Sequence, residues 1–138
     1  MRKPLFYLIL SICLFFSSTS FSQTSQKTNS IPEDTVFTEV KQMPSFPGGR
    51  DSLNTFMNRN IVYPSAAKEA GKSGWVYSCF IVEKDGTLSG AEIFRGIGYG
   101  CDEEVLRAIK LMPKWEPGLH EGKPVRVKQN WPVHFVNN

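Results

Sequence analysis

Few side chains in this sequence have the type and spacing that catalysis or metal binding requires. Beyond the apolar N-terminus, the candidates are two cysteines and two histidines: Cys79, Cys101, His120 and His134. No pair among them has the short spacing of zinc ligands, no Cys-x-x-Cys occurs, and no serine lies in a nucleophile elbow. Three acids, Asp102 to Glu104, follow Cys101 and oppose a reactive thiolate. We therefore expect no enzyme, no metal site and no cofactor.

A glycine-rich stretch from Gly96 to Gly100 precedes a predicted helix, as phosphate-binding loops do. It lacks both the Gly-Lys-Ser/Thr ending of a P-loop and the spacing of a dinucleotide fingerprint. The acids that follow it, Asp102 to Glu104, would repel phosphate and are typical of helix capping rather than of general acid–base catalysis. The stretch is interpreted as a flexible connection between a strand and a helix.

The most informative segment is at the C-terminus, where a Pro/Trp turn from Met112 to Gly118 leads into an alternating strand from Gly122 to Phe135. Pro132 lies inside this strand, and proline cannot donate to a sheet ladder, so the strand belongs at a sheet edge or a bulge. An open edge can pair with an extended peptide. Arg126 and Lys128 share one face, where they protect the edge from aggregation, steer an acidic partner, or do both.

The chain of 138 residues begins with Arg2 and Lys3, an apolar run from Leu5 to Phe16, and small polar residues up to Ser22. This pattern predicts a secretory signal peptide over residues 1–22. The run is shorter than the roughly 20 residues of a membrane span, but an uncleaved anchor remains the alternative. Cleavage lowers the net charge from +3 to +1, because it leaves 14 basic against 13 acidic residues. A nearly neutral domain gives no support to nucleic acid as a partner.

The remaining sequence predicts a flexible leader over residues 23–45, within which Ile31 to Val40 docks as an extended arm, followed by a single α+β domain over 46–136. The expected elements are, in order, a helix from Arg50 to Asn60, a short helix from Tyr63 to Gly71, a strand from Trp75 to Val82, a hairpin turn at Asp85-Gly86, a strand from Thr87 to Phe94, and a helix from Glu103 to Leu111 capped by Asp102. The first strand is apolar on both faces, which favours a central position. Cys79 and Cys101 are either a disulfide pair or two buried thiols.

The order and spacing of several segments resemble the TonB C-terminal domain family. These segments are Tyr63-Pro64 with Ala67, the Gly74–Val82 strand, Lys84-Asp85-Gly86, Gly100-Cys101-Asp102-Glu103-Glu104 leading to Met112-Pro113-Lys114-Trp115-Glu116-Pro117-Gly118, and Gly122-Lys123-Pro124-Val125 leading to Pro132-Val133-His134-Phe135. The match covers about Phe46 to Phe135.

The resemblance implies a three-stranded antiparallel sheet with a helix packed on one face, preceded here by short N-terminal helices. It also implies that the last strand binds the TonB-box peptide of an outer-membrane transporter by strand addition, in energy-coupled transport. Carried over by position, the peptide-binding residues that the resemblance implies are Val125, Arg126, Val127, Lys128, Gln129, Asn130, Trp131 and Val133. The expected location is the periplasm.

Two versions of this function stay open. An energy transducer would keep residues 1–22 as an inner-membrane anchor and engage inner-membrane motor proteins, whereas a soluble periplasmic adaptor or regulator would lose them. The sequence has no Pro-rich spacer, which favours the adaptor. A homodimer through the last strands is a further alternative, because an open edge also invites its own copy.

Overall fold

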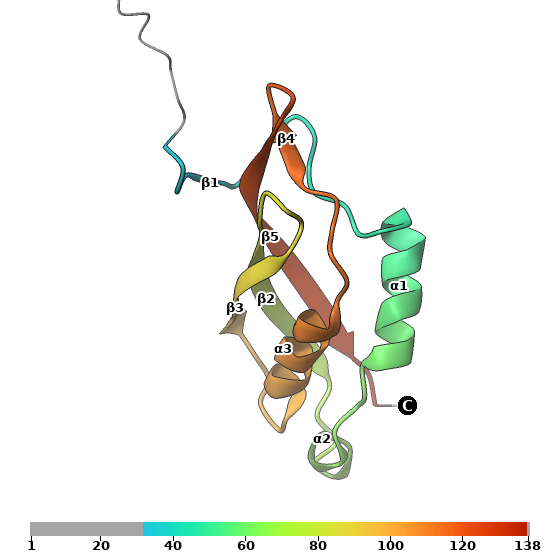
Figure 1. Ribbon diagram of the computed structural model, residues 1–138. Helices are drawn as coiled ribbons and strands as arrows, with labels where there is room; N and C mark the ends of the chain where they lie inside the picture. The colour runs from blue at the N-terminus through green and yellow to red at the C-terminus, as the bar shows by residue number, and fades with distance from the viewer. Residues whose placement is uncertain (1–31, 138) are drawn as a thin grey trace, which may run out of the picture.

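The computed structural model describes residues 32–137 and contains a mixed α+β domain (Figure 1). The elements in order are β1 (Val36–Phe37), α1 (Gly49–Asn60), α2 (Ser65–Glu69), β2 (Gly74–Val82), β3 (Leu88–Arg95), α3 (Cys101–Leu111), β4 (Gly118–His120) and β5 (Lys123–Phe135). The predicted signal peptide or anchor over 1–22 and the first part of the predicted leader, residues 23–31, lie outside the described residues. Within 32–137, no helix has both the length and the apolar character needed to cross a bilayer.

The sheet has five strands rather than the three that the sequence led us to expect. Its main path runs β1-β5-β2-β3, and β4 pairs with the beginning of β5. The long β2 strand is central, as predicted, because it pairs antiparallel with β3 on one side and with β5 on the other. The additional strands, β1 and β4, are only two and three residues long. Both were missed because strands this short show no alternation of apolar and polar residues in the sequence.

The turn between β2 and β3 forms at the predicted Asp85-Gly86 and holds the rigid C-terminal turn in place. Gly86 has a φ of 85°, and its carbonyl accepts the backbone N–H of Trp115 at 2.8 Å. A Cβ atom built on Gly86 would lie 2.0 Å from the carbonyl oxygen of Trp115. Only glycine supplies both this backbone conformation and this close approach.

The hydrophobic core lies between one face of the sheet and the helices (Figure 1). Phe80 in the middle of β2 is 1% exposed and packs edge-on against Trp115, while Ile109 and Val105 of α3 are buried in the same cluster. α1 adds only partly buried apolar side chains to it. α3 therefore covers the sheet, and α1 flanks it.

α3 begins differently from our prediction, because Asp102 is not its N-cap. Gly100 occupies the N-cap with a φ of 85°, and the helix starts at Cys101 without a side-chain cap. The carboxylate of Asp102 instead accepts the backbone N–H groups of Ile97 and Gly98, with Oδ1 at 3.0 and 3.3 Å. The acid thereby orders the glycine-rich connection that precedes the helix.

The segment from Val36 to Ser45, expected to be part of a flexible leader, is packed against the domain. After β1 it passes the tip of the β4–β5 hairpin on its way to α1 (Figure 1). Val40 is buried in a small cluster with Val125 and Val127. Farther on, the backbones of Ser45 and Glu116 exchange two hydrogen bonds of 3.1 and 2.8 Å. The expected docking of residues 31–40 as an arm therefore applies to its described part.

Candidate peptide-binding edge of the last strand

The edge of β5 that faces away from β2 is the candidate site, and one buried side chain shows which backbone groups lie along it. Ser78 lies opposite Trp131 in the β2–β5 pair, and its Oγ donates to the Trp131 carbonyl at 2.8 Å. The carbonyl of Trp131 therefore faces β2. Alternate residues of a strand direct their N–H and C=O groups to the same edge. Odd-numbered residues of β5 thus face β2, and even-numbered residues face the opposite edge.

The two prolines of β5 agree with this assignment. Pro124 and Pro132 are both even-numbered, so neither removes a donor from the ladder with β2. β4 pairs with the same edge of β5 as β2 does. The N–H of Leu119 donates to the Gln42 carbonyl at 2.9 Å, away from β5, so the backbone groups of the neighbouring Gly118 face β5. The partner of Gly118 is Val125, an odd-numbered residue, whose backbone groups therefore face the same edge as those that pair with β2. Only β1 pairs with the opposite edge among the described strands.

β1 covers just the start of that opposite edge. Val36 pairs with Arg126 and Phe37 with Val127, in parallel orientation. From Lys128 to Phe135, no strand of the described chain lies along it. The groups left there are the C=O of Lys128, both backbone groups of Asn130 and of His134, and the C=O of Pro132. The last strand is therefore an edge strand over its second half only.

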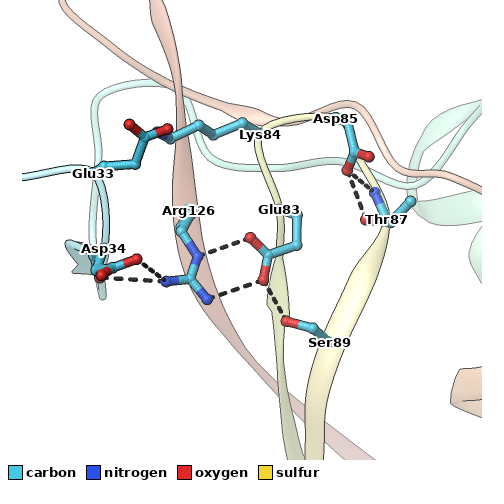
Figure 2. Close-up of polar contacts among 8 residues, drawn as sticks. All are labelled: Glu33, Asp34, Glu83, Lys84, Asp85, Thr87, Ser89 and Arg126. Carbon is cyan, nitrogen blue, oxygen red and sulfur yellow. Dashed lines mark hydrogen bonds and ion pairs between the residues drawn. The ribbon is translucent and has the colours of Figure 1, made fainter.

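Arg126 is held by its neighbours at the point where β1 joins β5. Figure 2 shows the guanidinium between Glu83 and Asp34: Nε and Nη2 donate to the two carboxylate oxygens of Glu83 at 2.7 and 3.1 Å, and Nη1 donates to the Asp34 carbonyl at 3.3 Å. The hydrogen bonds from Arg126 lower the pKa of Glu83 below its ordinary value, although partial burial opposes the shift. A fork of this kind fixes orientation as well as charge. Arg126 therefore joins β5 to Glu83 and to the arm, and its predicted contact with a peptide stays a prediction.

The other predicted site residues divide between the two faces of the sheet. Lys128 and Asn130 are exposed on the face away from α3, and Lys128 lies 3.5 Å from Glu92. Trp131 and Val133 are buried in the core, where Trp131 packs edge-on against Phe80. Of the remaining three, Val125 and Val127 lie beneath the arm with Val40, and Gln129 is half-buried. The side chains of the predicted set are therefore not gathered on a single surface, although their backbones share one strand.

A groove between α1 and β5 adjoins the open edge and was not predicted from the sequence. Its volume is about 460 Å³, and its lining comes from the segment before α1, the first two turns of α1, Trp115, and β5 from Gln129 to Pro132. The helical spacing of Leu53 and Phe56 predicted α1 itself. Its placement beside the strand edge depends on packing, so no pattern in the sequence could have revealed the groove.

The residues considered for catalysis or metal binding are dispersed and engaged elsewhere. Cys79 and Cys101 are both buried and free, and burial is the main cause that raises the pKa of each thiol. His120 stacks on Phe37 at 5.0 Å, and His134 stacks on Trp75 at 4.4 Å between ring centroids. Within residues 32–137 there is no group of three or more His, Cys, Asp or Glu side chains that could hold a metal ion.

Comparison with known proteins identifies the family. The model described as "Gram-negative bacterial TonB protein C-terminal" matches residues 59–136, more than half of the chain. The chain belongs to the TonB C-terminal family. The match starts at Arg59 and so includes the central sheet, α3 and all of β5, but neither the arm nor most of α1. No curated protein matches the chain.

Several solved structures of TonB C-terminal domains are similar to it. The NMR structure from Pseudomonas aeruginosa is 25% identical and covers 54% of this chain and 76% of its own, with a TM-score of 0.43. An NMR structure from Helicobacter pylori, residues 179–285 of that protein, is 20% identical and covers 67% and 87%, with a TM-score of 0.47. A second one from Helicobacter pylori, residues 194–285, is 19% identical and covers 64% and 92%, with a TM-score of 0.44.

Proposed function

We propose that this TonB C-terminal domain binds the extended N-terminal peptide of an outer-membrane transporter, the TonB box, by adding it as a strand to the open half of β5. The observation that carries the proposal is the row of backbone groups from Lys128 to Phe135 that has no partner strand in the described chain. In strand addition, main-chain hydrogen bonds provide affinity and pockets for alternate side chains provide specificity.

The structure supports a narrower site than the stretch from Val125 to Val133 that we first expected. The backbone groups of Val125 face β4, those of Val127 face β2, and β1 lies beside Arg126. A peptide that leaves the arm in place therefore pairs with Lys128 onward. Pro132 limits it further, because this residue offers an acceptor but no donor.

Asn130→Pro is the most direct test, because it removes one outward-facing N–H from the site. The ladder with β2 does not use this group, and β5 already holds prolines at positions of the same parity, so the variant should keep the fold. Asn130→Ala is the matched control, because it alters the side chain and keeps the N–H. Peptides from the N-termini of outer-membrane transporters of the source organism are titrated, with NMR of backbone amides as the readout.

We expect the amides of Asn130 and His134 to shift on binding to the unaltered protein, and Asn130→Pro to weaken binding by about tenfold or more, from the lost hydrogen bond and the added ring. Asn130→Ala should bind within about threefold of the unaltered protein. If saturating peptide leaves the amides from Lys128 to Phe135 unperturbed, strand addition at this edge is wrong.

The same edge serves an energy transducer and a periplasmic adaptor, and the fate of residues 1–22 distinguishes them. An energy transducer requires the anchor and contact with motor proteins of the inner membrane, whereas an adaptor requires neither. The mass of the exported protein decides between them. A chain that starts at Gln23 supports the adaptor, and a full-length chain in the inner-membrane fraction supports the transducer.

A further inference from the structure

Two residues that line the groove between α1 and β5 each carry a polar group that nothing in the described chain satisfies. Trp115 and Gln129 both line the groove, and the indole Nε1 of the first and the amide Nε2 of the second are buried without a hydrogen-bond partner. Trp115 as a whole is only 8% exposed. Folded proteins pair nearly all of their buried polar groups, so an unpaired donor needs an explanation. Because both unpaired donors belong to residues that line the same groove, we infer that their acceptor arrives from outside, on a ligand that enters the groove.

The charge of the groove indicates what kind of acceptor fits. Arg50, on the first turn of α1, is the one charged residue among those that line the groove. The nearby carboxylate of Glu116 is not part of the lining, and it accepts a hydrogen bond from Ser45 Oγ at 2.7 Å. Donors and a cation without a lining carboxylate are complementary to an anionic oxygen ligand. A carboxylate accepts several hydrogen bonds at once, and charged hydrogen bonds of this kind are the stronger ones.

The position of the groove places it within reach of an added strand. Its lining includes Asn130 and Pro132, whose backbones face the open edge, and Trp131, whose side chain faces the helices. Side chains of a strand alternate between the two faces of its sheet. Every second side chain of a peptide paired with β5 therefore points toward α1, and the side chain beside Gln129 to Trp131 enters the groove.

We propose that this groove is a side-chain pocket for an acidic residue, Asp or Glu, of the peptide that adds to β5. Trp115 Nε1–H and Gln129 Nε2–H donate to its carboxylate, and Arg50 provides the charge at the entrance. Phe46 and Leu53 pack around its methylene groups. The inference rests on the proposed strand addition and specifies which peptides the domain prefers.

The test uses peptide selection, because it requires no knowledge of the natural ligand. A displayed library of random ten-residue peptides is selected on the full-length protein, on Arg50→Glu and on Arg59→Glu. Arg59 lies on the same helix but does not line the groove, so the two variants change the net charge equally. We expect Asp or Glu to be enriched at one fixed position with the unaltered protein and with Arg59→Glu, and this enrichment to disappear with Arg50→Glu.

One enriched peptide is then examined by NMR with its acidic residue as Glu or as Gln. Binding of the Glu peptide should move the Trp115 indole N–H resonance, and the change to Gln should weaken binding by about tenfold. Gln129→Leu should reduce that difference between the two peptides to about threefold or less. These results together would support the pocket.

Failure of the pocket is distinguishable from failure of strand addition. Peptides that shift the Asn130 and His134 amides but show no acidic preference overturn the pocket and leave strand addition intact. An acidic preference that Arg50→Glu and Arg59→Glu alter equally reflects general charge attraction, and it also overturns the pocket. If no selected peptide shifts the amides of β5, both proposals are wrong.

Discussion

Val36 lies opposite Arg126 in a parallel pair at the outer edge of β5, and this pair sets the point where an added strand must begin. The arm before it is tied to the domain by charge, since Arg126 binds the Asp34 carbonyl and Lys84 lies 3.3 Å from Glu33 (Figure 2). Beyond the pair, Phe37 stacks on His120 and Val40 is buried. The chain therefore supplies its own partner to the first part of the edge.

Weakening the arm should open the start of this edge. In a parallel ladder, the backbone N–H and C=O of one residue bond to the two residues on either side of its partner in the other strand. Phe37 pairs with Val127, so its backbone groups bond to those of Arg126 and Lys128. Phe37→Ala removes the ring that stacks on His120, and we expect the Lys128 amide to exchange its hydrogen about tenfold faster. The Val133 amide, which faces β2, should be unchanged. Val36→Ala is the control, because this side chain is already 36% exposed. Equal exchange of Lys128 in all three proteins would contradict the assignment of β1.

Two glycines with similar backbone angles should respond very differently to alanine. Gly86 and Gly122 have φ of 85° and 77°, so a side chain at either position incurs the left-handed penalty of about 1–2 kcal/mol. A Cβ at Gly122 meets nothing within 4 Å, whereas at Gly86 it would lie 2.0 Å from the Trp115 carbonyl oxygen. Gly86→Ala should therefore lower the free energy of unfolding by at least about 1 kcal/mol more than Gly122→Ala, measured by urea denaturation. If Gly86→Ala and Gly122→Ala lower the free energy of unfolding equally, the turn at Gly86 moves away from Trp115 without an energetic cost.

Local signals predicted the elements that form through their own periodicity or turn chemistry. The helical spacing of Val105, Ile109 and Met112 and the stop at Pro113 located α3, and Asp85-Gly86 located the hairpin. Pro132 indicated a sheet edge or a bulge, and the part of β5 that contains it has no partner strand on its outer side within the described residues, although β1 pairs with the first part of that side. The family resemblance was confirmed, since its segments from Tyr63 to Phe135 lie inside the matched region, residues 59–136.

Contacts between distant segments could not be predicted in this way. The arm adds a strand through only two residues, Val36 and Phe37, and its position depends on the Arg126–Glu83 fork, whose members are 43 residues apart. The α1 groove likewise depends on the distance between a helix and a strand. Capping by Asp102 was a reasonable local prediction, but glycine at the N-cap left its carboxylate free to bind the preceding loop.

The Arg126–Glu83 pair predicts a specific loss of stability in acid. The pKa of Glu83 is lowered in the folded protein, chiefly by the hydrogen bonds from Arg126, from an ordinary value of 4.5. A lowered pKa means that the stabilisation is complete above about pH 5 and is lost as the pH falls through the folded-state value. Unfolding free energies from urea titrations at pH 7 and pH 3 should therefore differ less in Glu83→Gln than in the unaltered protein. Glu39→Gln, at an exposed acid that forms no ion pair within residues 32–137, should behave like the unaltered protein. If the free energy of unfolding falls between pH 7 and pH 3 by as much in Glu83→Gln as in the unaltered protein, this pair does not couple folding to protonation.

Gln129→Leu should separate stability from recognition. Its Nε2 is buried without a partner in the described chain, so replacement by an apolar side chain of similar size removes an unsatisfied donor and no internal hydrogen bond. We expect the free energy of unfolding to stay the same or to rise by up to about 1 kcal/mol. Ser78→Ala is the contrasting variant, because it removes a buried hydroxyl that is bonded to the Trp131 carbonyl, and it should lower that free energy by about 1 kcal/mol. Urea denaturation measures both. A loss in Gln129→Leu as large as that in Ser78→Ala would mean that the amide has a structural partner, and the argument for an external acceptor would fail with it.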